Sequence, residues 1–286
     1  MTRSAAPDGK GEHSHRHGDT QPADDGPRRP RLLFVDDDAY MRRLVSARLE
    51  RLGAQVETAV SAQACLEALA DRRPDVIISD AVMPVMDGFD LCRRIRADPA
   101  LRSIPFVILT ALTRDLRSRS LQAGADDYLS KLEHEVVFRL RVRLAFQLGL
   151  CRSGQAGPEP SAEPANLLVV SESSAVQTQM DTHLQREGIQ TRSVGTLAQA
   201  LQRLQVQVPD FLVLDLAYGQ KAVMDWAMRL RTTPGCEALP VMALAAKEDD
   251  AWLAGMEHHI QDRLSKPLES QESRHRVNLL LRIARR

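Results

Sequence analysis

The chain has 286 residues, a length that suits one large domain or two domains of ordinary size. Its 38 basic and 38 acidic side chains balance and 4% of its residues are aromatic, so we expect no nucleic-acid partner, which would need a positive surface or a stacking platform. No apolar run reaches the roughly 20 residues of a membrane span, and the four scattered cysteines form no CxxC pair, so we expect a cytoplasmic protein without a membrane partner.

Two stretches of the chain contain little that a core could bury. The first, residues 1–30, is polar throughout, and we expect a disordered tail because burial there would not offset the entropy of ordering. The second, residues 151–165, contains three prolines and is typical of a linker. Between and after them lie two candidate domains, residues 31–150 and residues 166–286.

Within the first candidate domain, short aliphatic runs alternate with amphipathic stretches. The runs Leu32–Val35, Val76–Ser79 and Phe106–Thr110 are continuous in apolar character, which indicates parallel strands covered on both faces. Residues Tyr40–Leu52 place apolar side chains at helical spacing. About five such strand–helix units fit into the segment, so we expect a doubly wound (βα)5 domain.

The last predicted helix of this domain, Glu135–Leu150, carries more apolar residues than one buried stripe needs. We expect part of it to pack against the second domain or a second subunit. The alternative is that all of it faces its own sheet.

The second candidate domain repeats the first after a shift of 135 residues, with no gap. The segment PDVIISD, which ends at Asp80, falls on PDFLVLD, which ends at Asp215, and YLSKL falls on RLSKP. The fold class predicted for the whole chain is therefore α/β, with two consecutive doubly wound, flavodoxin-like (βα)5 domains, each built on a parallel five-stranded sheet.

Polar side chains stand where the predicted strands of the first domain end. Asp36 and Asp37 follow the first strand, Asp80 ends the third, Thr110 ends the fourth and Lys131 follows the fifth. Side chains at the carboxyl ends of parallel strands meet in one crevice. Three carboxylates cannot lie close together and stay ionised without a cation, and Mg²⁺ with its preference for oxygen ligands would satisfy them.

This set of groups is suited to phosphoryl transfer. A metal-bound carboxylate such as Asp80 can attack phosphorus, and Mg²⁺ and Lys131 would neutralise the charge of the transferring group. Thr110 would hydrogen-bond to one of its oxygens.

The segments FVDDDAYMRR, DVIISDAVMPVMDGFDLCRRIR, FVILTA and GADDYLSK resemble the receiver domain of bacterial two-component response regulators. The resemblance implies that Asp80 accepts a phosphoryl group from a sensor histidine kinase or a phosphotransfer protein. It also implies that Asp37, Asp80 and the carbonyl of Val82 coordinate Mg²⁺, with Asp36 beside them through water.

The same resemblance assigns roles around the acceptor. The hydroxyl of Thr110 would swing toward the phosphoryl group, and the rotamer of Tyr128 would follow it. Met83-Pro84 and Asp87-Gly88 would form the turn after the acceptor.

Two features depart from the family pattern. Leu132 stands where the family has a proline after the lysine, so we expect the Lys131-Leu132 bond to be trans, since a cis bond there would cost about 3–4 kcal/mol. Val82 and Leu112 hold the positions that flank the path of the hydrolytic water, and neither can orient water. We therefore expect slow self-dephosphorylation.

The site of the second copy is damaged. The shifted positions hold Ser171, Glu172, Asp215, Ala245 and Lys266. One carboxylate has become a serine and the hydroxyl is missing at the alanine, so Mg²⁺ binding and switching should both be impaired. We expect a degenerate pseudo-receiver that serves as an interaction or scaffold domain.

The leading hypothesis is a response regulator of a phosphorelay. Tandem receivers of this kind resemble the front half of response-regulator diguanylate cyclases, but here we expect no output domain and no enzymatic activity. The signal would be a changed affinity for a downstream protein or for a second copy, such as a homodimer. One alternative is an adaptor that works independently of phosphorylation.

A second alternative is an aspartyl-phosphate phosphatase of the haloacid-dehalogenase kind. Those enzymes carry a DxDx[TV] motif on the first strand, whereas Asp36-Asp37-Asp38-Ala39 lacks the spaced threonine or valine.

Overall fold

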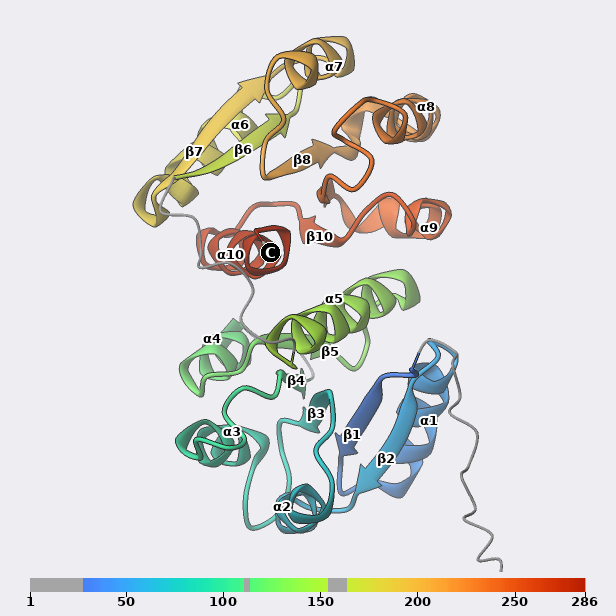
Figure 1. Cartoon of the computed structure of the whole chain (residues 1–286), viewed down its shortest axis with the longest axis vertical. Helices are drawn as coiled ribbons and strands as arrows, with labels where there is room; N and C mark the ends of the chain where they lie inside the picture. Colours follow the sequence, from blue (N-terminus) through green and yellow to red (C-terminus); the bar gives the residue numbers. More distant parts are fainter. Residues whose placement is uncertain (1–27, 111–113, 154–163, 286) are drawn as a thin grey trace, which may run out of the picture.

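Two lobes of the same architecture make up the computed structural model, which describes residues 28–110, 114–153 and 164–285 (Figure 1). The first lobe alternates strands and helices along the chain. Its elements are β1 (Arg31–Val35), α1 (Ala39–Glu50), β2 (Gln55–Ala59), α2 (Ala62–Asp71), β3 (Val76–Asp80), α3 (Gly88–Ala97), β4 (Phe106–Thr110), α4 (Arg114–Gln122), β5 (Asp127–Ser130) and α5 (Glu135–Ser153).

The second lobe repeats this alternation, with short 3₁₀ turns added between some elements. Its strands and α-helices are β6 (Ala165–Val170), α6 (Ser174–Leu184), β7 (Ile189–Val194), α7 (Leu197–Val206), β8 (Phe211–Asp215), α8 (Gln220–Arg231), β9 (Val241–Ala245), α9 (Asp250–Leu253), β10 (Asp262–Ser265) and α10 (Ser270–Ala284).

Each lobe contains one five-stranded sheet in which all neighbouring strands are parallel. The strand order is β2-β1-β3-β4-β5 in the first lobe and β7-β6-β8-β9-β10 in the second, so corresponding strands hold corresponding places. The predicted fold class is confirmed. The order also puts β5 and β10 at sheet edges, each with a single strand neighbour.

Apolar side chains on both faces of each sheet explain the continuous hydrophobic runs. In the first lobe Leu33 and Ile77 pack with residues of α2 and α3, whereas Phe34 and Ile78 pack with residues of α1 and α5. Side chains that alternate along a strand thus enter two different cores. This layering leaves the carboxyl ends of the strands free to carry polar groups.

The lobes are joined by α5, which is buried on two sides. Phe138 and Val142 pack on the sheet of the first lobe. Val137 and Leu140 belong to one core of the second lobe, and Leu144 belongs to its other core. The prediction that part of this helix packs against the second domain is therefore confirmed. Figure 1 shows α5 and α10 side by side between the two sheets, and α5 also contacts β10.

Element boundaries differ from the expected ones in the linker. Helix α5 continues to Ser153, beyond the predicted boundary at Leu150, and β6 begins at Ala165. The remaining linker residues, 154–163, lie outside the described residues, as do residues 1–27 of the predicted tail. Arg28, at the end of that tail, forms an ion pair with Asp75 at 3.1 Å.

Across the described residues, no helix combines the length and the apolar character that crossing a bilayer requires.

Candidate functional site

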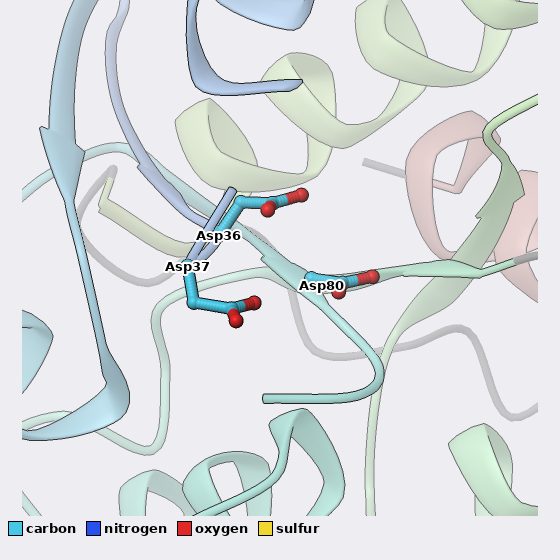
Figure 2. Close-up of side chains that lie close together, drawn as sticks. All are labelled: Asp36, Asp37 and Asp80. Atoms are coloured by element: carbon cyan, nitrogen blue, oxygen red, sulfur yellow. The ribbon is translucent and has the colours of Figure 1, made fainter. Parts of the chain in front are cut away.

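Three predicted carboxylates meet at the carboxyl end of the first sheet. Asp36 and Asp37 follow β1, and Asp80 ends β3, the strand beside it. One carboxylate oxygen from each residue lies within 4.8 Å of the other two (Figure 2). Asp36 is fully buried, Asp80 is 7% exposed and Asp37 is open to solvent, so the cluster has a closed floor and an accessible side.

Lys131 joins two of these carboxylates. Its Nζ lies 2.8 Å from Oδ1 of Asp80 and 3.2 Å from Oδ2 of Asp36. Asp80 Oδ1 also accepts a hydrogen bond from the backbone N–H of Ala81 at 2.9 Å. The sequence prediction that Asp36, Asp37, Asp80 and Lys131 converge therefore agrees with the structure.

Burial and charge act against each other in this pair. Burial raises the pKa of Asp80, and the hydrogen bond and charge of Lys131 only partly oppose it. Burial also disfavours the charge of Lys131, but the hydrogen bond and charge of Asp80 outweigh it, and the pKa of Lys131 is raised. One ammonium therefore does not supply enough positive charge to balance the carboxylates of the cluster.

The donor set fits Mg²⁺. Carboxylate oxygens are the ligands that this hard cation prefers, and an exposed carboxylate at the rim leaves room for bound water. Asp36, Asp37 and Asp80 are the side chains that would hold the ion.

Backbone geometry near Asp80 explains part of the turn that the sequence predicts. A Cβ on Gly88 would lie 2.0 Å from the backbone oxygen of Asp80, so only glycine fits there. The N–H of Gly88 donates to the carbonyl of Ala81 at 3.1 Å. Asp87 begins α3 by accepting a hydrogen bond from the N–H of Asp90 at 2.7 Å.

Thr110 ends β4, the strand next to β3. Its side chain is buried, and within the described residues its hydroxyl has no hydrogen-bond partner. A buried hydroxyl without a partner is costly, and this one is placed at the strand end where the site lies.

The departures from the family pattern are visible in the loops. Val82 is 69% exposed, with no polar atom on its side chain. The Lys131-Leu132 bond is trans, as predicted, since Lys266-Pro267 is the only cis peptide in the described part of the chain. Leu112, the other residue expected beside the water path, lies outside the described residues.

The corresponding site in the second lobe is closed on itself. Asp215 is 1% exposed, and its Oδ2 accepts a hydrogen bond from the hydroxyl of Ser171 at 2.6 Å. Its Oδ1 pairs with Lys266 and accepts from the N–H of Ala217 at 3.0 Å. In the described residues, the one acidic cluster able to hold a metal ion is that of the first lobe.

Tyr128 is buried, but much of its cover comes from the other lobe. Its ring stacks on the ring of His275 with centroids 5.7 Å apart. The guanidinium of Arg276 lies 5.1 Å from the ring centroid. In the second lobe the corresponding residue is Arg263, which pairs with Asp250 at 2.6 Å. With Ala245 in place of the threonine, neither switch position of the second lobe carries the side chain that it has in the first.

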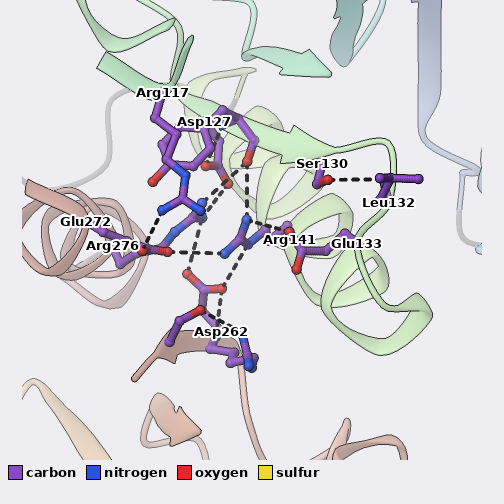
Figure 3. A network of polar contacts seen from close by, with 12 residues as sticks. Arg117, Asp127, Ser130, Leu132, Glu133, Arg141, Asp262, Glu272 and Arg276 are labelled. Atoms are coloured by element: carbon purple, nitrogen blue, oxygen red, sulfur yellow. Dashed lines mark hydrogen bonds and ion pairs between the residues drawn. The ribbon is translucent and has the colours of Figure 1, made fainter. Parts of the chain in front are cut away.

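A buried charge network between the lobes was missed by the sequence analysis. Arg276 pairs with Asp127 at 2.7 Å, and Arg141 lies 4.0 Å from Asp262 (Figure 3). The two aspartates correspond to each other under the shift of 135 residues, and so do the two arginines. The repeat of charged residues at both positions was the signal that could have pointed to them.

Comparisons with known proteins agree on the class of both lobes. The model of the response regulator receiver domain matches residues 32–143 and again residues 167–278. Response regulator PleD of Caulobacter vibrioides is 29% identical over 265 residues, which cover 86% of this chain and 58% of PleD. The transcriptional regulatory protein AfsQ1 of Streptomyces coelicolor is 34% identical over 182 residues, covering 62% of this chain and 77% of AfsQ1.

Among solved structures, the signal receiver domain of a histidine kinase from Syntrophus aciditrophicus is similar to part of this chain. That domain is 34% identical, covers 46% of this chain and 98% of its own, and gives a TM-score of 0.41.

Proposed function

The chain belongs to the response regulator receiver domain family through both of its lobes, and on that premise we propose that Asp80 accepts a phosphoryl group from a sensor histidine kinase or a phosphotransfer protein. The observation that supports the proposal most directly is the cluster of Asp36, Asp37 and Asp80 with the ammonium of Lys131 beside it.

The transfer is a substitution at phosphorus. A carboxylate oxygen of Asp80 forms a bond to phosphorus while the bond from phosphorus to the imidazole nitrogen of the donor breaks. The imidazole leaves with the bonding electrons and takes up a proton, and Asp80 becomes an acyl phosphate.

The residues around Asp80 each supply one part of this chemistry. Asp36, Asp37 and Asp80, with the carbonyl of Val82, would hold Mg²⁺, which supplies positive charge opposite the phosphoryl oxygens. Lys131 moves its hydrogen bond from the free carboxylate to a phosphoryl oxygen. Thr110 gains in that oxygen a partner for its buried hydroxyl, which has none among the described residues.

The second lobe has a different role in this proposal. Both oxygens of Asp215 are held, one by Ser171 and one by Lys266, and the lobe has no cluster for Mg²⁺ within the described residues. It is a pseudo-receiver that takes part in protein contacts. The output of the chain is a changed affinity of its surfaces for a downstream protein or a second copy.

Phosphorylation by a small donor tests the proposal. The full chain is incubated with Mg²⁺ and acetyl phosphate, and the modified residue is located by mass spectrometry after the acyl phosphate is reduced with borohydride. We expect modification at Asp80 and none at Asp215, and no modification in Asp80→Asn or without Mg²⁺.

Modification of Asp80→Asn to the same extent would reject Asp80 as the acceptor. If a binding partner were retained equally by the wild type, its phosphorylated form and Asp80→Asn, the chain would be an adaptor that works without phosphorylation.

A further inference from the structure

Strand β5 lies between the acidic cluster and the second lobe. It is four residues long and has one strand neighbour, β4. Lys131, directly after it, reaches Asp80 and Asp36. Asp127, its first residue, reaches Arg276 of the second lobe. A short edge strand has few hydrogen bonds to its own sheet, so groups on its open side can decide where it lies.

Arg276 fills that open side with a buried positive charge. It is 0% exposed, and its Nη1 lies 2.7 Å from Oδ2 of Asp127. Its Nη2 donates to the backbone carbonyl of Tyr128 at 3.4 Å, and its guanidinium lies over the ring of the same residue. Arg276 thus contacts three groups of the strand: the carboxylate of Asp127 (Figure 3), and the backbone carbonyl and aromatic ring of Tyr128.

The charges around Arg276 are balanced by both lobes. Burial disfavours the charge of Arg276, but Asp127 and Asp262 outweigh it and place its pKa well above the ordinary value. Burial likewise opposes ionisation of Asp127, yet Arg276 and His275 lower its pKa. The ion pair is therefore formed at neutral pH.

Within the described residues, no side chain of the first lobe pairs with the carboxylate of Asp127, although Arg141 and Arg117 also lie over the Tyr128 ring, 6.0 Å and 5.8 Å from its centroid. Arg141, on its own α5, approaches the same carbonyl of Tyr128 at 3.5 Å, but its other partners are Glu133 and the second lobe's Asp262 and Glu272. Asp127 has as its side-chain partners Arg276 and His275, both from α10.

We propose that Arg276 is a positioning residue for the acceptor site of the other lobe: by holding β5 at Asp127 and Tyr128, it fixes the strand whose end presents Lys131 to Asp80. The second lobe, which cannot be phosphorylated in the proposed function, would then set how readily the first lobe is loaded. The inference rests on the proposed function only in taking Asp80 as the acceptor.

The coupling is reciprocal, because a contact that favours the loaded site must itself be favoured by loading. Phosphorylation of Asp80 draws Lys131 toward the phosphoryl group and so changes the position that β5 favours. The second lobe then senses the state of the first through Arg276.

Kinetics of the full chain test the positioning role. We compare Arg276→Gln with Glu257→Gln, a matched control that removes a buried charge from the same interface but faces Arg139 and Arg143 on α5, away from β5. The maximal rate of Asp80 phosphorylation by acetyl phosphate should fall at least about fivefold in Arg276→Gln, because a group misplaced by about 1 Å can lower a rate by up to about 100-fold. It should stay within about twofold of wild type in Glu257→Gln.

Two further variants separate positioning from folding. Asp127→Asn with Arg276→Gln removes both charges of the closest pair together, while Asp262 keeps Arg141 at 4.0 Å, so no buried carboxylate is left without a cation. This double variant should keep the fold but not the rate. Arg276→Lys keeps the charge without the fork that reaches two groups and should recover only part of the rate. Equal rates in the wild type, the double variant and Arg276→Gln would overturn the proposal.

Affinity for Mg²⁺, measured by calorimetry, gives an independent readout. The position of Lys131 between Asp36 and Asp80 affects the metal cluster directly, so Arg276→Gln should change this affinity and Glu257→Gln should not. If the wild type bound Mg²⁺ but took no phosphoryl group, the proposed function would fail, while the affinities would still decide the positioning role.

Tryptophan fluorescence reports the reverse direction. Trp226 and Trp252 are the two tryptophans of the chain, and both lie in the second lobe. Loading the first lobe with Mg²⁺ and acetyl phosphate should change their emission in the wild type and not in Arg276→Gln. Emission that stays constant in the wild type during full loading would count against coupling across the interface.

Discussion

Asp80 and Asp215 hold corresponding places, but their oxygens have different partners. In Asp80, Lys131 and the N–H of Ala81 both engage Oδ1, and no hydrogen bond to Oδ2 is found among the described residues. In Asp215, Ser171 engages Oδ2 and Lys266 engages Oδ1. A serine hydroxyl donates where an aspartate could only accept. One substitution thus turns a carboxylate that needs a metal into one that is satisfied by protein.

We expect the exposed side chain of Val82 to affect the lifetime of the phosphorylated state. A water that attacks the acyl phosphate finds no hydrogen-bond partner on it. We expect Val82→Asn to speed loss of the phosphoryl group by roughly 2- to 10-fold, because a net hydrogen bond contributes about 0.5–1.5 kcal/mol. Adding Leu112→Glu should speed it further. The measurement is the decay of radiolabelled protein after the donor is removed.

Val85→Asn provides the matched control for this prediction. Val85 is an exposed valine of the same loop with a positive φ of 69°, a backbone conformation that asparagine adopts more readily. Its decay rate should equal that of wild type. Equal or faster decay of wild type compared with the Val82→Asn, Leu112→Glu double variant would show that these positions do not shield the acyl phosphate.

At the scale of elements, α5 joins the two lobes, because its side chains pack in the cores of both. An ordinary outer helix of a doubly wound domain has one apolar stripe and one polar face. In α5, Phe138 and Val142 serve the first sheet, while Leu140 and Leu144 complete two cores of the second lobe. The apolar surplus in the sequence therefore has a structural cause.

A pair of leucine truncations tests this double role. Leu144→Ala removes packing from a core of the second lobe, whereas Leu49→Ala on α1 removes packing from a core formed by the first lobe alone. Each should lower the free energy of unfolding by about 2–5 kcal/mol. In urea titrations followed by tryptophan emission, which reports the second lobe, Leu144→Ala should shift the transition more than Leu49→Ala. A shift of equal or smaller size would mean that α5 does not stabilise the second lobe.

The two lobes meet in a pseudo-symmetric interface, in which the edge strand of each lobe contacts the last helix of the other. Asp127 on β5 faces Arg276 on α10, and Asp262 on β10 faces Arg141 on α5. Ion pairs at the periphery, such as Arg117 with Glu272 at 3.2 Å, add to the same interface. Buried pairs of this kind add little net stability but penalise any other arrangement of the lobes.

Acid should weaken the interface between the lobes through protonation of Asp127, which pairs with Arg276. The pKa of Asp127 is lowered in the folded protein, so its contribution to stability is present above the ordinary pKa near 4 and is lost as pH falls through the folded value. Asp127→Asn cannot titrate. The difference in unfolding free energy between wild type and Asp127→Asn should therefore be largest at pH 5 and above and shrink at lower pH.

Asp262 acts in the opposite direction, because burial raises its pKa, and the charge of Asp127 adds to that rise. Both carboxylates share Arg276, so the comparison is made with Asp262→Asn in both proteins, which removes the titration of Asp262 from the difference. Denaturant titrations between pH 3 and pH 7 measure the difference. If the difference were constant across that range, Asp127 would not be held as a charged partner of Arg276.

The sequence alone determined the two lobes, their sheets and the acidic cluster. Continuous apolar runs for the strands and a period of 3.6 for the helices depend on neighbours along the chain, and the gapless repeat gave the same order of elements twice. Asp36, Asp80 and Lys131 could be brought together on paper because parallel strands end at one edge. The helix end at Ser153 was predicted at Leu150, because the residues that follow Leu150 carry no apolar pattern that would extend the helix.

Tertiary structure alone decided how the lobes meet and what that meeting does to the site. Arg276 and Asp127 are far apart in sequence, and nothing local to either one indicates a buried partner. Equally, the hydroxyl of Ser171 could have faced solvent, but the fold turns it onto Asp215. Periodicity determines which face of an element is buried, whereas charge pairing across an interface depends on the orientation of two finished surfaces, which only the packed molecule specifies.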